Sequence, residues 1–128
     1  MVLINKNEHL NIRFFYNKSI VWININFPIK KYKCDRICIT GGEPLIQHDI
    51  FNLIDNLIKK QYKIVIETNG SIDIKPLTKK KSLMISLDIK CPSSEMTDKM
   101  NYNNLIHLEK KDQLKFIIKN KNDFDFAK

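Results

Sequence analysis

Residues 36–44 read Arg-Ile-Cys-Ile-Thr-Gly-Gly-Glu-Pro and decide the fold. The apolar run at 37–39 is typical of a strand buried on both faces, as in a parallel sheet. Gly41 and Gly42 permit positive φ and let a ligand approach the backbone. Pro44 suits the first turn of a helix, where no backbone N–H is needed. The stretch therefore predicts a buried strand, a tight loop and the beginning of a helix.

The same alternation continues toward the C-terminus. Apolar residues spaced by three and four predict a helix from Ile50 to Ile58. Further apolar runs predict strands at 62–66, 83–87 and 113–118, and shorter helices are expected at 101–110 and 123–128. Strands that alternate with helices at this spacing are typical of a β/α chain with a parallel sheet.

The N-terminal part has a different pattern, which predicts a β-hairpin within residues 1–33. Its strands are expected at 12–16 and 20–27, with a turn at 17–19. With 128 residues and no linker-like stretch, the whole chain (1–128) is expected to form a single domain.

Charge and composition exclude several classes of protein. Lys and Arg number 22 against 14 Asp and Glu, a net charge of +8, but the excess runs along the whole chain and only two residues are Arg. We therefore expect no direct nucleic-acid surface. Neither a secretory signal nor an apolar run of membrane-spanning length is evident, so we expect no membrane association and a cytoplasmic location.

Polar residues collect directly after three of the predicted strands. They are Thr40 to Glu43, Glu67 to Ser71, and Asp88 with Lys90. Because the carboxyl ends of parallel strands share one edge of the sheet, these groups are expected to form one site. Glu43 could receive a cation there or brace its loop.

Four strings carry a family resemblance: Ile-Thr-Gly-Gly-Glu-Pro-Leu at 39–45, Ile-Glu-Thr-Asn-Gly-Ser at 66–71, Ser-Leu-Asp-Ile-Lys-Cys-Pro-Ser-Ser at 86–94, and Leu-Lys-Phe-Ile-Ile at 114–118. In this order, residues 34–128 resemble the 7-carboxy-7-deazaguanine synthases, a family of radical S-adenosylmethionine (SAM) enzymes. The resemblance implies a partial (β/α) barrel of the radical SAM type, with a parallel sheet and helices on its outer face. It also implies SAM, a [4Fe–4S] cluster, Mg²⁺ and a homodimer.

The implied reaction is the radical ring contraction of 6-carboxy-5,6,7,8-tetrahydropterin to 7-carboxy-7-deazaguanine, a precursor in tRNA queuosine and archaeosine biosynthesis. By motif, Thr40 would contact this small-molecule pterin. The residues that the resemblance assigns to the amino group, ribose and carboxylate of SAM are Gly41, Gly42, Glu43, Ser71, Asp88, Lys90 and Cys91. Whether Glu67, Lys115 and His48 face the site or serve structure stays open.

The cysteines depart from the family pattern. A radical SAM cluster is held by Cys-x₃-Cys-x₂-Cys, and the three cysteines here, at 34, 38 and 91, do not have that spacing. We therefore assign no catalytic residue and no metal ligand, and expect the chain alone not to cleave SAM. A truncated, mis-started or decayed copy of the enzyme would each explain the pattern, with residues 1–33 divergent.

Two alternatives remain. One is another radical SAM enzyme such as a glycyl-radical activase, which shares the Gly-Gly-Glu-Pro string. The other is a non-catalytic binder of a nucleotide or nucleic acid that retains the scaffold.

Overall fold

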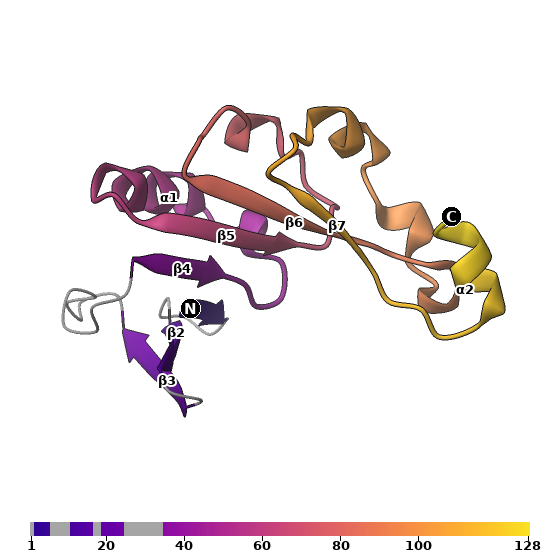
Figure 1. Cartoon of the computed structure of the whole chain (residues 1–128), viewed down its shortest axis with the longest axis horizontal. Helices are drawn as coiled ribbons and strands as arrows, with labels where there is room; N and C mark the ends of the chain where they lie inside the picture. The colour runs from indigo at the N-terminus through magenta and orange to yellow at the C-terminus, as the bar shows by residue number, and fades with distance from the viewer. Residues whose placement is uncertain (1, 6–10, 17–18, 25–34) are drawn as a thin grey trace.

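The computed structural model describes residues 2–5, 11–16, 19–24 and 35–128, and these form two sheets (Figure 1). The first is antiparallel, with the order β1 (Val2–Asn5), β2 (Asn11–Tyr16) and β3 (Ser19–Asn24). β2 and β3 pair antiparallel over residues close to those expected for the two strands of the hairpin. Of the expected turn at 17–19, Ser19 begins β3, and residues 17–18 and 25–27 lie outside the described residues.

The second sheet is parallel and carries the site. Its strands are β4 (Arg36–Ile39), β5 (Lys63–Thr68), β6 (Leu83–Ile89) and β7 (Gln113–Phe116). They are hydrogen-bonded in the order in which they follow along the chain. Neighbouring strands in chain order, all parallel, are the arrangement of a segment of a β/α barrel. The predicted α/β class and parallel sheet are confirmed.

Only the first crossover contains an α-helix, α1 (Ile50–Lys59), which buries Ile50, Ile54 and Leu57. The later crossovers use 3₁₀ turns instead, so the outer face has fewer α-helices than the resemblance implied. The 3₁₀ turn that precedes α1 is η2 (Pro44–Ile46). The turns of the later crossovers are η3 (Lys75–Leu77), η4 (Pro92–Ser94), η5 (Thr97–Lys99) and η6 (Tyr102–His107). The chain closes with α2 (Lys121–Phe126), where a helix was expected.

The segment expected as a helix at 101–110 is the 3₁₀ helix η6, and Asn104 accounts for the difference. Its side chain is buried and donates to the carbonyl oxygens of Gly70 and Ile72, at 3.1 and 2.9 Å. Its Oδ1 accepts from the N–H of Ile74 at 3.1 Å. A buried amide must find partners, and these three backbone groups hold η6 against the loop after β5.

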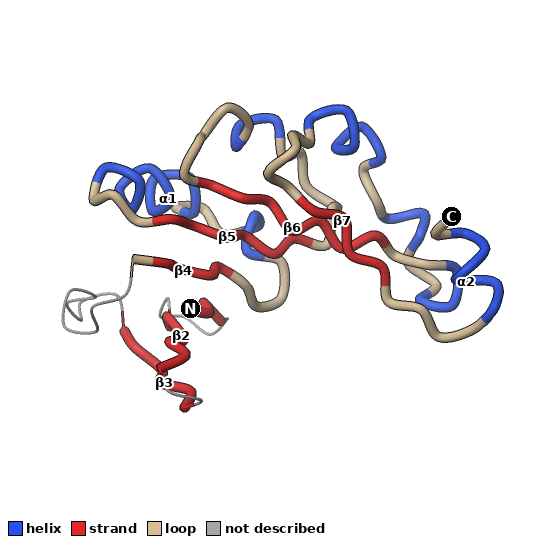
Figure 2. The backbone as a smooth tube through the Cα atoms, viewed as in Figure 1, coloured by secondary structure: helices blue, strands red, loops and turns tan. Residues whose placement is uncertain are grey.

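The two faces of the parallel sheet differ in chemistry because side chains alternate along each strand. One face packs against α1 and the η3 turn, which contribute Ile54 and Leu77 to the core (Figure 2). Its strand residues are the aliphatic core: Ile37, Ile39, Ile64, Ile66, Leu83, Ile85, Leu87 and Ile89. The opposite face, here called the open face, has half-buried apolar residues in the middle of β5 and at the beginning of β6 and becomes polar toward the carboxyl ends of the strands.

The three-stranded sheet lies on the side of β4 that faces away from β5, and its strand β1 contacts β4 (Figure 1). Among the helices of the described ranges, none combines the length and hydropathy needed to cross a bilayer.

Candidate functional site

The carboxyl ends of the parallel strands surround an open depression of about 410 Å³, here called the carboxyl-end pocket. This is the edge at which ligand sites form in parallel β/α sheets. Its lining residues come from the loop after β4, from the end of β5 and the residue after it, from the end of β6 and the residue after it, and from β7: Thr40, Gly42, Glu43, Glu67, Thr68, Asn69, Asp88, Lys90 and Lys115. The structure thus brings together polar groups that the sequence separates by up to 75 positions.

The loop after β4 depends on two glycines and one carboxylate. Gly41 and Gly42 have φ of 111° and 56°, which L side chains rarely adopt. Glu43 is buried, with 6% of its surface exposed, and braces the loop. Its Oε1 accepts from the N–H of Leu45 at 3.0 Å, which caps the following turn.

Glu43 also connects this loop to the neighbouring one. Its Oε1 accepts from Thr68 Oγ1 at 2.9 Å, and its Oε2 accepts from the N–H of Asn69 at 2.6 Å. The sequence left open whether Glu43 receives a cation or braces its loop, and these contacts show that it braces the loop. The backbone of Gly42, which lines the pocket, therefore remains for a ligand.

A second pair of side chains crosses the open face from β4 to β5. Thr40 lies just beyond β4 and donates from Oγ1 to Glu67 Oε2 at 3.0 Å. The sequence left open whether Glu67, Lys115 and His48 face the site. Glu67 of β5 and Lys115 line the pocket, whereas His48 does not.

Asp88 and Lys90 form a half-buried ion pair at the end of β6. Lys90 Nζ lies 2.6 Å from Asp88 Oδ2, with 29% and 14% of the two side chains exposed. The other oxygen, Asp88 Oδ1, is buried and receives no hydrogen bond within the described part of the chain. Lys115 stands directly across from Asp88 in the β6–β7 register. A buried acceptor without a donor costs stability, so it marks a place suited to a donating ligand.

Three predicted residues do not line this pocket: Gly41, Ser71 and Cys91. Ser71 is exposed, and its N–H donates to Asn69 Oδ1 at 2.9 Å. Cys91 is 2% exposed and lies at the η4 turn, which packs against α2. Burial, with a further contribution from Asp123, raises the pKa of its thiol.

The two described cysteines do not fit a [4Fe–4S] cluster. Cys38 lies within β4 at 1% exposure, and burial raises the pKa of its thiol to about 12, with Glu67 adding to the shift. A cluster needs thiolates that converge, whereas burial raises the pKa of both thiols, and one lies within β4 and the other at the η4 turn. Cys34 lies outside the described residues. Across 35–128 and the three N-terminal strands, no group of three His, Cys, Asp or Glu could hold a metal.

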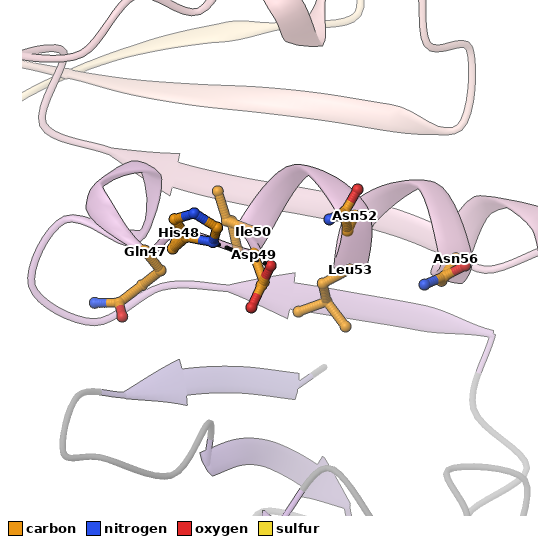
Figure 3. Close-up of a pocket in the computed structure, with 7 residues that line it drawn as sticks. All are labelled: Gln47, His48, Asp49, Ile50, Asn52, Leu53 and Asn56. Carbon is orange, nitrogen blue, oxygen red and sulfur yellow. Dashed lines mark hydrogen bonds and ion pairs between the residues drawn. The ribbon is translucent and has the colours of Figure 1, made fainter.

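Thr68 and Asn69 line the pocket, as expected for the polar group at 67–71, although the motifs gave neither of them a role of its own. The available signal was their position directly after a buried strand. His48 lies instead beside a separate depression along α1, with Gln47, Asp49, Asn52, Leu53 and Asn56 (Figure 3). Its side chain is almost fully exposed and its Nδ1 lies 3.2 Å from Asp49 Oδ1.

Fold and pocket together define a β/α protein with its candidate ligand site at the carboxyl ends of parallel strands. Curated relatives narrow this class. The chain is 35% identical over 114 residues to the 7-carboxy-7-deazaguanine synthase of Thermoplasma acidophilum, covering 89% of this chain and 54% of the relative. Over 92 residues it is 39% identical to that of Methanospirillum hungatei, covering 71% and 38%, and over 101 residues 35% identical to that of Clostridium acetobutylicum, covering 77% and 46%.

The chain is therefore related to the 7-carboxy-7-deazaguanine synthases, and the resemblance read from its motifs is confirmed. It spans about half the length, or less, of these relatives. No family model matches the chain.

Proposed function

We propose that the carboxyl-end pocket binds SAM, and that the chain carries this part of a 7-carboxy-7-deazaguanine synthase. The relatives named above all bear that name, which favours this function over a glycyl-radical activase. The observation that carries the proposal is Asp88 Oδ1, a buried acceptor without a donor in a pocket that also contains cations.

The pocket has groups of both signs, as a zwitterion requires. The methionine part of SAM carries an ammonium and a carboxylate. Asp88 Oδ1 and the carbonyl groups of the Gly41–Gly42 loop would accept from the ammonium, and Lys115 would pair with the carboxylate. Thr68 and Asn69 lie where hydroxyl groups of the ribose could be hydrogen-bonded.

The finer assignment follows the family resemblance. The substrate would be 6-carboxy-5,6,7,8-tetrahydropterin, contacted by Thr40, and the reaction its radical ring contraction to 7-carboxy-7-deazaguanine within a homodimer. SAM and an iron–sulfur cluster would supply the radical chemistry. The protein would orient both molecules and exclude water. Because the described cysteines do not fit a cluster, we derive no step through it and propose that the 128-residue chain binds SAM without cleaving it.

SAM titration by calorimetry tests the pocket. Asp88→Asn removes the charge of the open acceptor and is expected to weaken SAM binding by about tenfold or more, because a hydrogen bond to a charged group contributes about 1.5–3 kcal/mol. Asp98→Asn is the matched control, since Asp98 is also paired with a neighbouring lysine, Lys99 at 3.4 Å, but is exposed. Equal affinities of the Asp88→Asn variant and the wild type would show that SAM does not bind here.

Anaerobic reconstitution with iron and sulfide tests the second part. We expect no absorbance band at about 400 nm above that of free iron sulfide, because too few thiolates converge. A stoichiometric [4Fe–4S] cluster on this chain would contradict the proposal while leaving the SAM result intact.

A further inference from the structure

The opposite end of the parallel sheet has a second pocket, of about 380 Å³, lined by cationic side chains. Arg36 and Lys63 are the first residues of β4 and β5 and are partners in the register. Lys81 and Lys111 come just before β6 and β7. Each of the four parallel strands therefore begins at a cation, and these cations share one pocket, here called the amino-end pocket.

Nearby carboxylates balance most of this charge. Asp35 lies 3.5 Å from Lys63 Nζ and 4.0 Å from Arg36 Nε. Glu109 and Asp112 lie 2.8 and 3.5 Å from Lys111 Nζ, which is buried and held by these ion pairs rather than by aligned hydrogen bonds. These three carboxylates pair with Arg36, Lys63 and Lys111, and none of them is paired with Lys81.

Lys81 is the cation that these carboxylates leave for a ligand. The preceding residue, Lys80, points toward α1, where its Nζ forms an ion pair with Asp55. Lys81 lines the amino-end pocket instead and forms no ion pair within the residues that the structure describes. The neighbouring Ser82 adds a hydroxyl group to the same lining.

The rest of the lining is apolar. Val65 and Met84 are partners in the β5–β6 register and lie half-buried on the open face. A flexible thioether beside a branched aliphatic group adapts to an apolar or aromatic ligand body. The pocket thus offers a cationic edge next to an apolar wall, in a volume suited to a small molecule.

We propose that the amino-end pocket binds a small phosphate monoester. Its phosphate would lie among Lys63, Lys81 and Ser82, and its apolar body would rest on Val65 and Met84. A phosphate, with its three terminal oxygens and nearly two negative charges, uses several donors at once, whereas a carboxylate presents only two oxygens. This site is independent of the carboxyl-end pocket, so it neither requires nor excludes SAM binding there.

Phenyl phosphate is the probe, because it lacks the adenosine that SAM would share with a nucleotide. Amide chemical shifts of the ¹⁵N-labelled chain are followed during its titration, and the largest changes are expected at Ser82 and Met84. Phenol and inorganic phosphate, which each offer half of the ligand, are expected to bind about tenfold more weakly or worse. Inorganic phosphate binding as tightly as phenyl phosphate, or shifts confined to Thr40 and Asp88, would overturn the proposal.

Two double variants separate the pocket from the general positive charge of the chain. Lys63→Gln with Lys81→Gln should weaken phenyl phosphate binding by about tenfold or more. Lys59→Gln with Lys60→Gln removes the same charge from the exposed end of α1 and should change the affinity by less than about twofold. Equal weakening in both would show diffuse attraction and would refute a built site. The shift mapping on the wild type decides the question even if a variant folds poorly.

Discussion

The buried carboxylate of Glu43 offers the sharpest test of how the carboxyl-end pocket is held together. It accepts three hydrogen bonds, from the N–H of Leu45, from Thr68 Oγ1 and from the N–H of Asn69. Glu43→Gln keeps the shape but replaces one oxygen by an NH₂ group. In either orientation of the amide, its NH₂ group faces a backbone N–H, that of Leu45 or that of Asn69, and two donors cannot form a hydrogen bond.

The expected loss can be worked out from these contacts. One hydrogen bond to a charged acceptor disappears and one donor stays buried without a partner, so the free energy of unfolding should fall by about 2–4 kcal/mol. Thr68→Val removes the hydroxyl that donates to Glu43 and accepts from the N–H of Gly70 at 3.2 Å, and should cost about 1–2 kcal/mol.

Urea unfolding followed by circular dichroism measures both losses. Glu95→Gln is the control, because Glu95 is exposed, and its effect should stay within about 0.5 kcal/mol. A Glu43→Gln variant as stable as this control would refute the bracing role and with it the geometry of the pocket.

Two further predictions concern the C-terminal half. Hydrogen bonds from Ser93 lower the pKa of Asp123 below its usual 3.8, so the carboxylate stabilises the fold above that pH, and the contribution is lost as the pH falls through the lowered pKa. The stability difference between wild type and Asp123→Asn should therefore be constant near neutral pH and shrink in acid, and a difference that widens on acidification would contradict this. Gly70 has φ of 75°, and a Cβ there would lie 2.6 Å from Met100 Cε. Gly70→Ala should lower the unfolding free energy by about 1–3 kcal/mol, measured by thermal melting, and an unchanged melting temperature would show that this loop is not strained.

Much of the architecture was predictable because it depends on local patterns. Apolar runs predicted β4, β5, β6 and β7, and the three-and-four spacing predicted α1. β4, β5, β6 and α1 each bury a stripe or face that a short stretch of residues already encodes, whereas β7 has only exposed and half-buried residues. Polar residues at strand ends likewise indicated the edge of the sheet at which the carboxyl-end pocket lies.

The contents of that pocket were less predictable. Lys115 belongs to the pocket because the β6–β7 register sets it across from Asp88, and no local pattern states a register. Ser71 and Cys91, which the motifs placed with SAM, do not line the pocket, because one is exposed beyond Gly70 and the other is buried near α2.

By itself, the sequence determined the strands, the main helix and the order in which polar groups follow them, since these depend on neighbouring residues. Only the tertiary structure decided that Glu43 braces two loops, that Asp88 Oδ1 has no donor in the described chain, and that Asn104 turns an expected helix into a 3₁₀ one. The physical reason is that a buried polar group must be matched with whatever the fold brings within about 3 Å, and those partners lie tens of residues away along the chain.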